Sequence, residues 1–211
     1  MNQDTTEIND ILCSALIASV REFVETFLKA KLSSGLYFHS IQHTMEVVEA
    51  TIEIGSQSAL SREDFEVVII AAWFHDIGYG IRYQDHENES ANLAGMFLKQ
   101  HLVEESKIEK IKNCILATRY PQLPSTKLEE IICDADFYHF SRSDYIAHEQ
   151  ALRKEWSTIL DMVFSDGDWN ELNYKMLKSH QYFTPYGKRV LQVNKFMNLE
   201  RLEKLTQENR E

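Results

Sequence analysis

The sequence contains little glycine, proline or cysteine. Only 7 glycines and 3 prolines occur among 211 residues, so we expect few tight turns and much helix. The cysteines, Cys13, Cys114 and Cys133, are odd in number and form no CxxC pair, which argues against a disulfide framework. We therefore expect a protein of a reducing compartment.

A long apolar run and a basic leader are also missing. No apolar stretch approaches the roughly 18 residues of a membrane span, and the first residues, MNQDTTEIND, are polar and acidic, unlike a signal peptide. The sequence therefore predicts a cytoplasmic protein that neither crosses nor binds a membrane.

Positive charge is scarce relative to negative charge. The chain has 22 Lys and Arg against 33 Asp and Glu, a formal net charge of -11, which would repel a nucleic-acid backbone or an anionic membrane. This excludes long nucleic acids as expected partners. A small anionic ligand would need a local positive group, either a metal ion or a few Arg and Lys side chains.

Apolar residues recur at spacings of three and four almost throughout the chain, and no alternating strand pattern is present. The sequence therefore predicts an all-α protein, and its length suits a single domain over residues 1–211. The expected helices cover residues 5–32, 39–55, 61–76, 87–102, 105–119, 126–140, 143–164, 168–179 and the segment after Pro185.

Two helix ends are suggested by particular residues. Ser61 followed by Asp64 resembles a capping box, and Asp168 could cap the helix that ends near Ser179. The last helix carries an apolar stripe amid charge, so it would pack on the domain or on a second copy of the chain. A homodimer through this C-terminal helix is one expected assembly.

The stretch AAWFHDIGYG places His75 and Asp76 at the end of an apolar helix. One interpretation is structural, because histidine suits the negative end of a helix dipole and Gly78 and Gly80 are ordinary stop signals. The other is a functional pair. Adjacent helix residues point about 100° apart, so His75 and Asp76 could reach one ion only at a helix end or a local distortion.

Further imidazole and carboxylate groups occur on other expected helices. His39 and His43 are four residues apart in YFHSIQHTMEVVEA, and IICDADFYHF contains Asp134 and Asp136. Each of these features alone is more often structural than functional. Together they would make a mixed nitrogen and oxygen site for one divalent ion such as Mn, Fe, Co, Zn or Mg.

The order His, then His-Asp, then Asp on successive helices resembles the HD-domain superfamily of metal-dependent phosphohydrolases. The motifs that carry the resemblance are YFHSIQHTMEVV, AAWFHDIGY, HENESANLAGMFL, ILATRY and DADFYHF, over about residues 37–140. LRKEW and HQYFT resemble the tail of uncharacterised bacterial members. The resemblance implies a compact multi-helix bundle with a metal site between core helices, completed by helices over about residues 143–208.

The resemblance also implies the roles of individual residues. The metal ligands would be His43, His75, Asp76 and Asp136, with Asp134 the rival of Asp136 for the last place. Asp136 follows an alanine and precedes a bulky residue, as the final aspartate of the family commonly does. His39 takes the place of a histidine that protonates the leaving oxygen in cyclic-nucleotide phosphodiesterases, and Asp76 joins it as a catalytic residue.

The sequence departs from the family pattern at several places. His86 matches the first of two extra histidines found in members with two metals, but Thr118 stands where the second would be, so one ion is expected. The Glu-Asp pair of the alarmone hydrolases is replaced by Ile77 and Gly78. The HD-GYP signature and the extended motif of the deoxynucleotide triphosphatases are also missing, so no substrate subclass is implied.

The function implied is metal-dependent hydrolysis of a small phosphate ester, a nucleotide or cyclic nucleotide, by metal-activated water. Arg119 and His86 would bind the non-bridging oxygens, although Arg119 would equally suit a solvated helix end. The aromatic residues Trp73, Phe74 and Tyr79 are expected in the core. The alternatives are a catalytically degenerate HD domain that binds nucleotide as a regulatory module, and a di-iron oxygenase, against which Thr118 counts.

Overall fold

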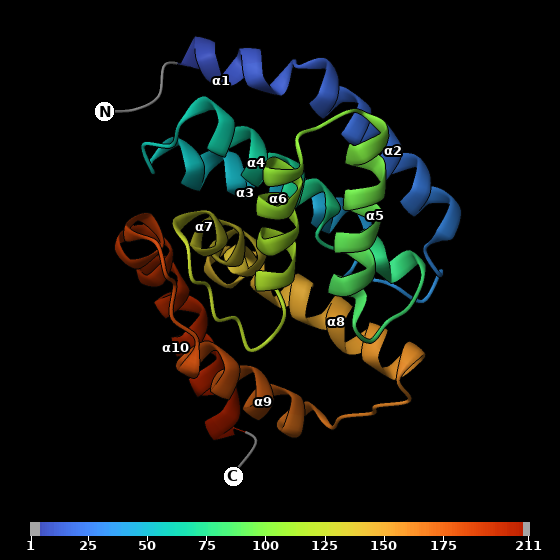
Figure 1. Ribbon diagram of the computed structural model, residues 1–211. Coiled ribbons are helices and arrows are strands. Elements are labelled where there is room, and N and C mark those ends of the chain that lie inside the picture. The colour runs from blue at the N-terminus through green and yellow to red at the C-terminus, as the bar shows by residue number, and fades with distance from the viewer. Residues whose placement is uncertain (1–4, 209–211) are drawn as a thin grey trace. The chain divides into compact units, whose positions relative to one another are not determined.

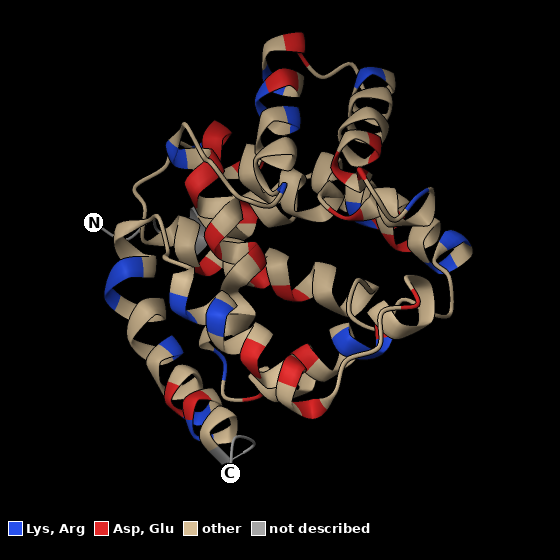
Figure 2. Ribbon diagram, turned by 90° about the horizontal axis from the view of Figure 1, so that it is seen from below, with Lys and Arg blue, Asp and Glu red and all other residues tan. Residues whose placement is uncertain are grey.

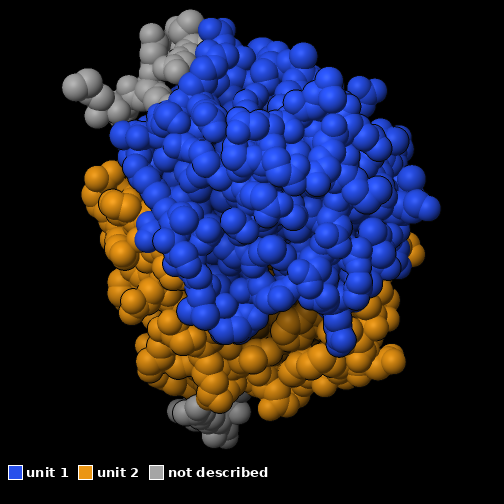
Figure 3. Space-filling model, in the orientation of Figure 1, with its two compact units in different colours: residues 1–33, 39–136 blue, residues 34–38, 137–211 orange. Residues whose placement is uncertain are grey.

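The computed structural model describes residues 5–208, which contain ten α-helices and no β-strand. The expected all-α fold is therefore confirmed. The chain forms two compact units, residues 1–33 with 39–136 and residues 34–38 with 137–211 (Figure 3). The organisation as one domain stays a prediction. None of the helices described is both long and apolar enough to cross a membrane.

The first unit holds seven α-helices and one short 3-10 helix. They are α1 (Thr5–Leu12), α2 (Ala15–Lys31), α3 (Ile41–Ser56), α4 (Arg62–Phe74), the 3-10 helix η1 (Ile77–Gly80), α5 (His86–Gln100), α6 (Glu105–Ala117) and α7 (Lys127–Asp136).

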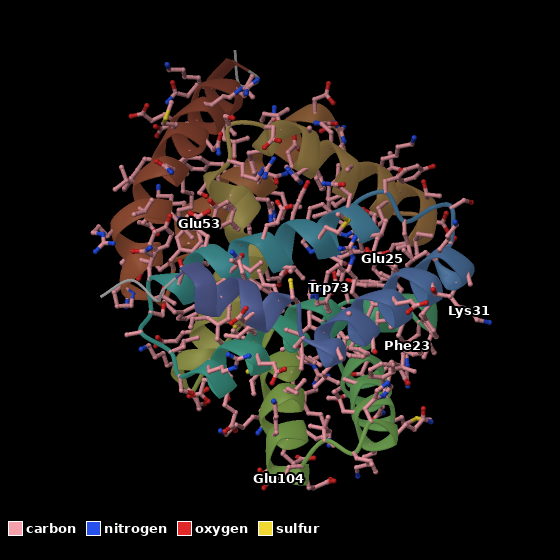
Figure 4. The ribbon with its side chains drawn as sticks, turned by 90° about the horizontal axis from the view of Figure 1, so that it is seen from above. Phe23, Glu25, Lys31, Glu53, Trp73 and Glu104 are labelled. Carbon is pink, nitrogen blue, oxygen red and sulfur yellow. The ribbon has the colours of Figure 1, made fainter. Side chains whose placement is uncertain are left out.

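Helix α4 is the centre of this unit and packs against α1, α2, α3, α5, α6 and α7 (Figure 1). Every residue from Val67 to Phe74 is buried, because α4 is apolar around its whole circumference and neighbours cover all its sides. Trp73 of α4 and Phe23 of α2 are labelled in Figure 4, and the Phe23 ring lies 6.0 Å from that of Phe74. The end of α4 is thus fixed by the core.

Serine caps determine where several helices begin. The side chains of Ser14, Ser40, Ser61 and Ser165 each accept the backbone N–H three residues later and so satisfy one of the free N–H groups of the first turn. The expected cap at Ser61 is confirmed, and its hydroxyl also donates to the Asp64 carboxylate at 2.9 Å. Asp168 is not a cap, because Ser165 takes that place.

Other caps correct the predicted boundaries. The helix expected over residues 5–32 is divided, because Ser14 has an extended backbone and caps a new helix. The helix expected from residue 39 begins at Ile41, since Ser40 is its cap. The helix expected to run to residue 140 ends at Asp136 and continues as the 3-10 helix η2 (Phe137–Ser141).

The second unit contains η2, α8 (Tyr145–Ile159), α9 (Asp166–Ser179), the π-helical segment η3 (Gly187–Leu191) and α10 (Gln192–Glu208). Helix α10 packs against α9, η2 and η3, and its Asn198 donates to the carbonyl oxygens of Phe140 and Arg142 at 2.9 and 2.8 Å. Val193, Phe196 and Met197 of the same helix are exposed. The predicted dimer through this helix stays a prediction.

Candidate metal centre

The first histidine of the site, His43, lies in the first turn of α3 and is buried. Its backbone N–H donates to the hydroxyl of Ser40, which fixes the start of the helix. His39 was expected on the same helix face, but it precedes the cap and is outside the helix. Its ring still lies 6.1 Å from that of His43, measured between centroids.

The His-Asp pair occupies the end of α4, where the helix gives way to η1. His75 is the C-cap residue, and Asp76 has left the helical conformation, with φ -110° and ψ 4°. This change in backbone direction lets two consecutive side chains point to the same place. His75 Nδ1 lies 2.8 Å from the carbonyl oxygen of Ala72 and, by donating to it, orients Nε2 toward Asp76 and Asp136.

Imidazoles and carboxylates from three helix ends meet at one point. Nε2 of His75 lies 3.2 Å from Oδ2 of Asp76 and 3.8 Å from Oδ1 of Asp136. Nε2 of His43 lies 3.4 Å from each of the same two oxygens. Among the described residues, His43, His75 and Asp136 each offer one donor atom within 4.8 Å of the others. Asp76 is not in this set of three, but its Oδ2 contacts both imidazole nitrogens at the distances just given, so all four predicted ligands lie close together.

Two of these donor atoms are buried without a hydrogen bond. Nε2 of His75 and Oδ2 of Asp76 have no hydrogen-bond partner in the part of the chain that the structure describes. A buried polar atom is costly to leave without a partner, and a divalent ion would satisfy both. The donors are imidazole nitrogens and carboxylate oxygens, which suit Zn, Mn, Fe or Co. The residues fit the predicted ion.

The electrostatics of the pair follow from its burial and its neighbours. Burial lowers the pKa of His75, but the negative charges of Asp76 and Asp136 outweigh it and raise the pKa to about 9. Burial would raise the pKa of Asp76, but the imidazoles of His75 and His86 hold it well below its usual value. Asp76 is therefore a carboxylate, the form in which it can bind a cation.

Between the two rival aspartates, Asp136 joins the donor set and Asp134 does not. Asp134 is fully buried in α7, whereas the side chain of Asp136 is 20% exposed. Gln122, which the sequence did not single out, donates from Nε2 to Oδ2 of Asp136 at 3.2 Å. That hydrogen bond leaves Oδ1 of Asp136 facing the imidazoles.

The predicted substrate-binding residues lie beside α5. His86, its first residue, has Nε2 3.3 Å from Oδ1 of Asp76, and its pKa is raised because the Asp76 carboxylate outweighs the effect of burial. Arg119 donates to Asp85 at 2.6 Å and lies 3.6 Å from Glu87. Thr118, in the place of a further histidine, donates its hydroxyl to Ile115 O at 2.7 Å.

The aromatic residues before and after the His-Asp pair differ in location. Trp73 and Phe74 are in the core as expected. Tyr79 was expected there too, but it is only half-buried and its ring stacks on His39 and on His86. No pattern in the sequence distinguished it from a core residue, because these contacts join segments distant along the chain.

One family model and one solved structure are similar to this chain. A model of the HD domain matches residues 40–141. The crystal structure of a predicted HD superfamily hydrolase from an uncultured Thermotogales bacterium is similar in fold, with a TM-score of 0.62 and 18% sequence identity over 90% of this chain and 91% of that chain. No curated protein matches the sequence.

The matched range begins at the cap of α3 and extends past the end of α7. It therefore includes His43, His75, Asp76 and Asp136, while His39 lies one residue before it. The all-helical fold and the position of the His-Asp pair at a helix end agree with the match of residues 40–141 to the model of the HD domain.

Proposed function

We propose that this protein is a metal-dependent phosphohydrolase that acts on a small phosphate ester, a nucleotide or cyclic nucleotide. The observation that carries the proposal is the cluster of buried His43, His75 and Asp76 with the half-buried Asp136, within the range that matches an HD domain. The solved structure of similar fold is described as a predicted hydrolase, which supports a hydrolytic reaction.

The four residues of the cluster would hold one divalent ion. The ion would lower the pKa of a water molecule and neutralise charge at phosphorus. His75 and Asp76 keep their donor atoms in place because both are buried at the end of the core helix α4. Asp136 is oriented by the hydrogen bond from Gln122, an outer contact of the kind that tunes metal sites.

His39 is the group best situated to give a proton to the leaving oxygen. It is half-buried, its ring lies beside His43, and Nε2 is 3.0 Å from the hydroxyl of Tyr79. Histidine is the side chain that most often acts as a general acid in enzymes. His39 is absent from the donor set of the cluster, so its proton transfer would not compete with metal binding.

The net negative charge of the chain favours a small anionic substrate over a long nucleic acid, which it would repel. The net charge is -11, and acidic and basic side chains are interleaved along the helices (Figure 2). Arg119 is paired with Asp85 and Glu87 and would exchange these carboxylates for a phosphate, which can accept two parallel N–H bonds from a guanidinium. His86 would bind a second oxygen.

The experiment starts with protein purified without added metal, whose ions are measured by elemental analysis. We expect about one divalent ion per chain. His75→Ala should lose it, whereas His101→Ala should keep it, because His101 contacts Phe97 of α5 and is not in the donor set. Two tightly bound ions per wild-type chain would contradict a mononuclear centre.

The same preparation is then screened with nucleotides, cyclic nucleotides and other phosphodiesters in the presence of Mn, Mg, Co or Fe. Metal-dependent release of phosphate or of a nucleoside monophosphate by the wild type, lost in His75→Ala, is the expected result. A protein that binds metal and nucleotide but hydrolyses no ester would instead be the regulatory module that the sequence leaves as an alternative.

A further inference from the structure

The ring of Tyr79 lies between two imidazoles. On one face the ring of His39 stacks with centroids 4.1 Å apart and planes at 25°, and on the other the ring of His86 stacks at 3.9 Å and 20°. The two histidines come from different elements, since His39 precedes α3 and His86 begins α5. The Tyr79 side chain therefore contacts both His39, the proposed proton donor, and His86, the proposed substrate-binding histidine.

The hydroxyl of Tyr79 makes one of these contacts directional. It lies 3.0 Å from Nε2 of His39, so it donates to that nitrogen when the imidazole is neutral and accepts from it when the imidazole is protonated. His86 directs its Nε2 to Oδ1 of Asp76 instead. The centroids of the two imidazoles are 6.3 Å apart, and the tyrosine ring fills that interval.

Tyr79 itself is held by the backbone around it. Its N–H donates to Asp76 O at 3.1 Å, and the preceding residue, Gly78, donates to Ser90 Oγ of α5 at 2.9 Å. Segment η1 is therefore fixed to the His-Asp pair at one side and to α5 at the other. His39 lacks such support from a helix, because it lies before the cap residue Ser40.

We infer that Tyr79 is a positioning residue for His39: its ring sets the plane of the imidazole, and its hydroxyl engages Nε2, so that Nδ1 of the protonated imidazole gives its proton to the leaving oxygen. A proton donor must be aligned with the leaving oxygen within a small angle to be effective. A tyrosine that only filled space would not need its hydroxyl on the imidazole. The inference rests on the proposed role of His39 as general acid.

The first test uses the leaving group. Tyr79→Phe keeps the ring and removes the hydroxyl, and Tyr83→Phe is the matched control, because Tyr83 meets the His39 and Tyr79 rings edge-on at 6.1 and 5.2 Å. The probes are p-nitrophenyl and phenyl esters of phosphate, monoesters and diesters, with Mn²⁺. Phenolate is a poorer leaving group than p-nitrophenolate because it is more basic. Its departure therefore depends more on protonation by a general acid.

With the phenyl esters, kcat of Tyr79→Phe should fall about 10- to 100-fold, the effect expected when a hydrogen bond to a charged group is lost. With the p-nitrophenyl esters kcat should fall much less, and KM should stay within about twofold for both. Tyr83→Phe should match the wild type. An equal loss with both leaving groups would overturn the inference, because a general structural defect would not depend on the leaving group.

The second test does not require activity. Diethyl pyrocarbonate modifies accessible imidazole nitrogens, and peptide mapping by mass spectrometry gives the rate at His39. The rate should rise several-fold in Tyr79→Phe and stay unchanged in Tyr83→Phe, since only the former frees Nε2. An unchanged rate in Tyr79→Phe would overturn the inference. If the wild type hydrolyses no ester while the rate rises as expected, the proposed function fails and the contact between Tyr79 and His39 stands.

Discussion

The backbone of Gly78 lies directly against that of His86: a Cβ atom on Gly78 would stand 2.0 Å from the carbonyl oxygen of His86 and 2.9 Å from Ser90 Oγ. A residue without a side chain is needed here, because a backbone carbonyl cannot swing aside as a flexible side chain can. This close approach brings the first turn of α5 to η1, and with it His86 to Asp76 and Tyr79.

Gly78→Ala should therefore destabilise the fold by about 3 kcal/mol, the upper range for overpacking a buried site, as measured by urea unfolding. Gly95→Ala, in α5, is the control, since its Cβ would lie 3.5 Å from the flexible Lys112 side chain. That change should be neutral or should stabilise by up to about 1 kcal/mol through helix propensity. Equal stability of the two variants would show that the first turn of α5 can move enough to accommodate a methyl group at residue 78.

Asp136→Asn should reduce the metal content far more than Asp134→Asn. Oδ1 of Asp136 lies 3.4 and 3.8 Å from the imidazole nitrogens of His43 and His75, and asparagine removes the negative charge that balances a cation there. Elemental analysis of both folded variants decides the matter. Equal metal content in the two variants would contradict Asp136 as the last ligand. A larger loss in Asp134→Asn would make Asp134 the ligand.

Gln122→Leu should weaken metal affinity about 10- to 100-fold, the usual effect of losing an outer contact to a ligand. The physical reason is the hydrogen bond from Nε2 of Gln122 to Oδ2 of Asp136, without which the carboxylate can rotate. Competition with a chelator measures the affinity. Gln100→Leu, at the exposed end of α5, controls for the substitution. Wild-type affinity in Gln122→Leu would mean that the core alone orients Asp136.

The helical class of this fold could be predicted because apolar residues spaced by three and four fit only helices. Helix boundaries were predictable where a cap residue stands at an interruption of the apolar pattern, as at Ser61. Ser14 and Ser40 lie within continuous apolar patterns, so their caps were missed. The cap depends on local backbone geometry, which periodicity does not contain.

The residues of the metal centre could be predicted from residue type and order, since His43, His75 and Asp136 follow the order His, His-Asp, Asp of the HD superfamily. The choice between Asp134 and Asp136 needs tertiary structure, because two positions on a helix differ by about 200° in direction. The contacts of Tyr79 with His39 and of Arg119 with Asp85 join residues 40 and 34 positions apart. No local pattern encodes such pairs.

In the second unit, Glu149→Gln should change the pH dependence of stability. Burial raises the pKa of Glu149 from 4.5 to about 7, against the lowering effects of Gln150, Arg153 and Arg201. Because the folded-state pKa is raised, the stabilising contribution of the protonated form is complete below about pH 4.5 and is lost as pH rises through about 7. The variant should therefore gain stability relative to the wild type across this window.

The expected gain is about 1.4 kcal/mol per unit of pKa shift at most, seen as a difference in Tm between pH 5 and pH 8. Glutamine keeps an oxygen that can accept the N–H of Trp169, which donates to Glu149 in the wild type. Glu200→Gln, at an exposed position of α10, should show no such difference. If Tm depends on pH in the same way in Glu149→Gln and in the wild type, the pH dependence does not come from Glu149.

His39→Ala should lower turnover by about 10²- to 10⁴-fold, the usual contribution of a general acid, and should leave metal content unchanged. The two effects separate because His39 is outside the donor set of His43, His75 and Asp136, although its ring meets the His43 ring edge-on, with centroids 6.1 Å apart. Steady-state kinetics and elemental analysis on the same preparation measure both. Loss of the ion would make His39 a ligand, and unchanged turnover would leave it a structural partner of Tyr79.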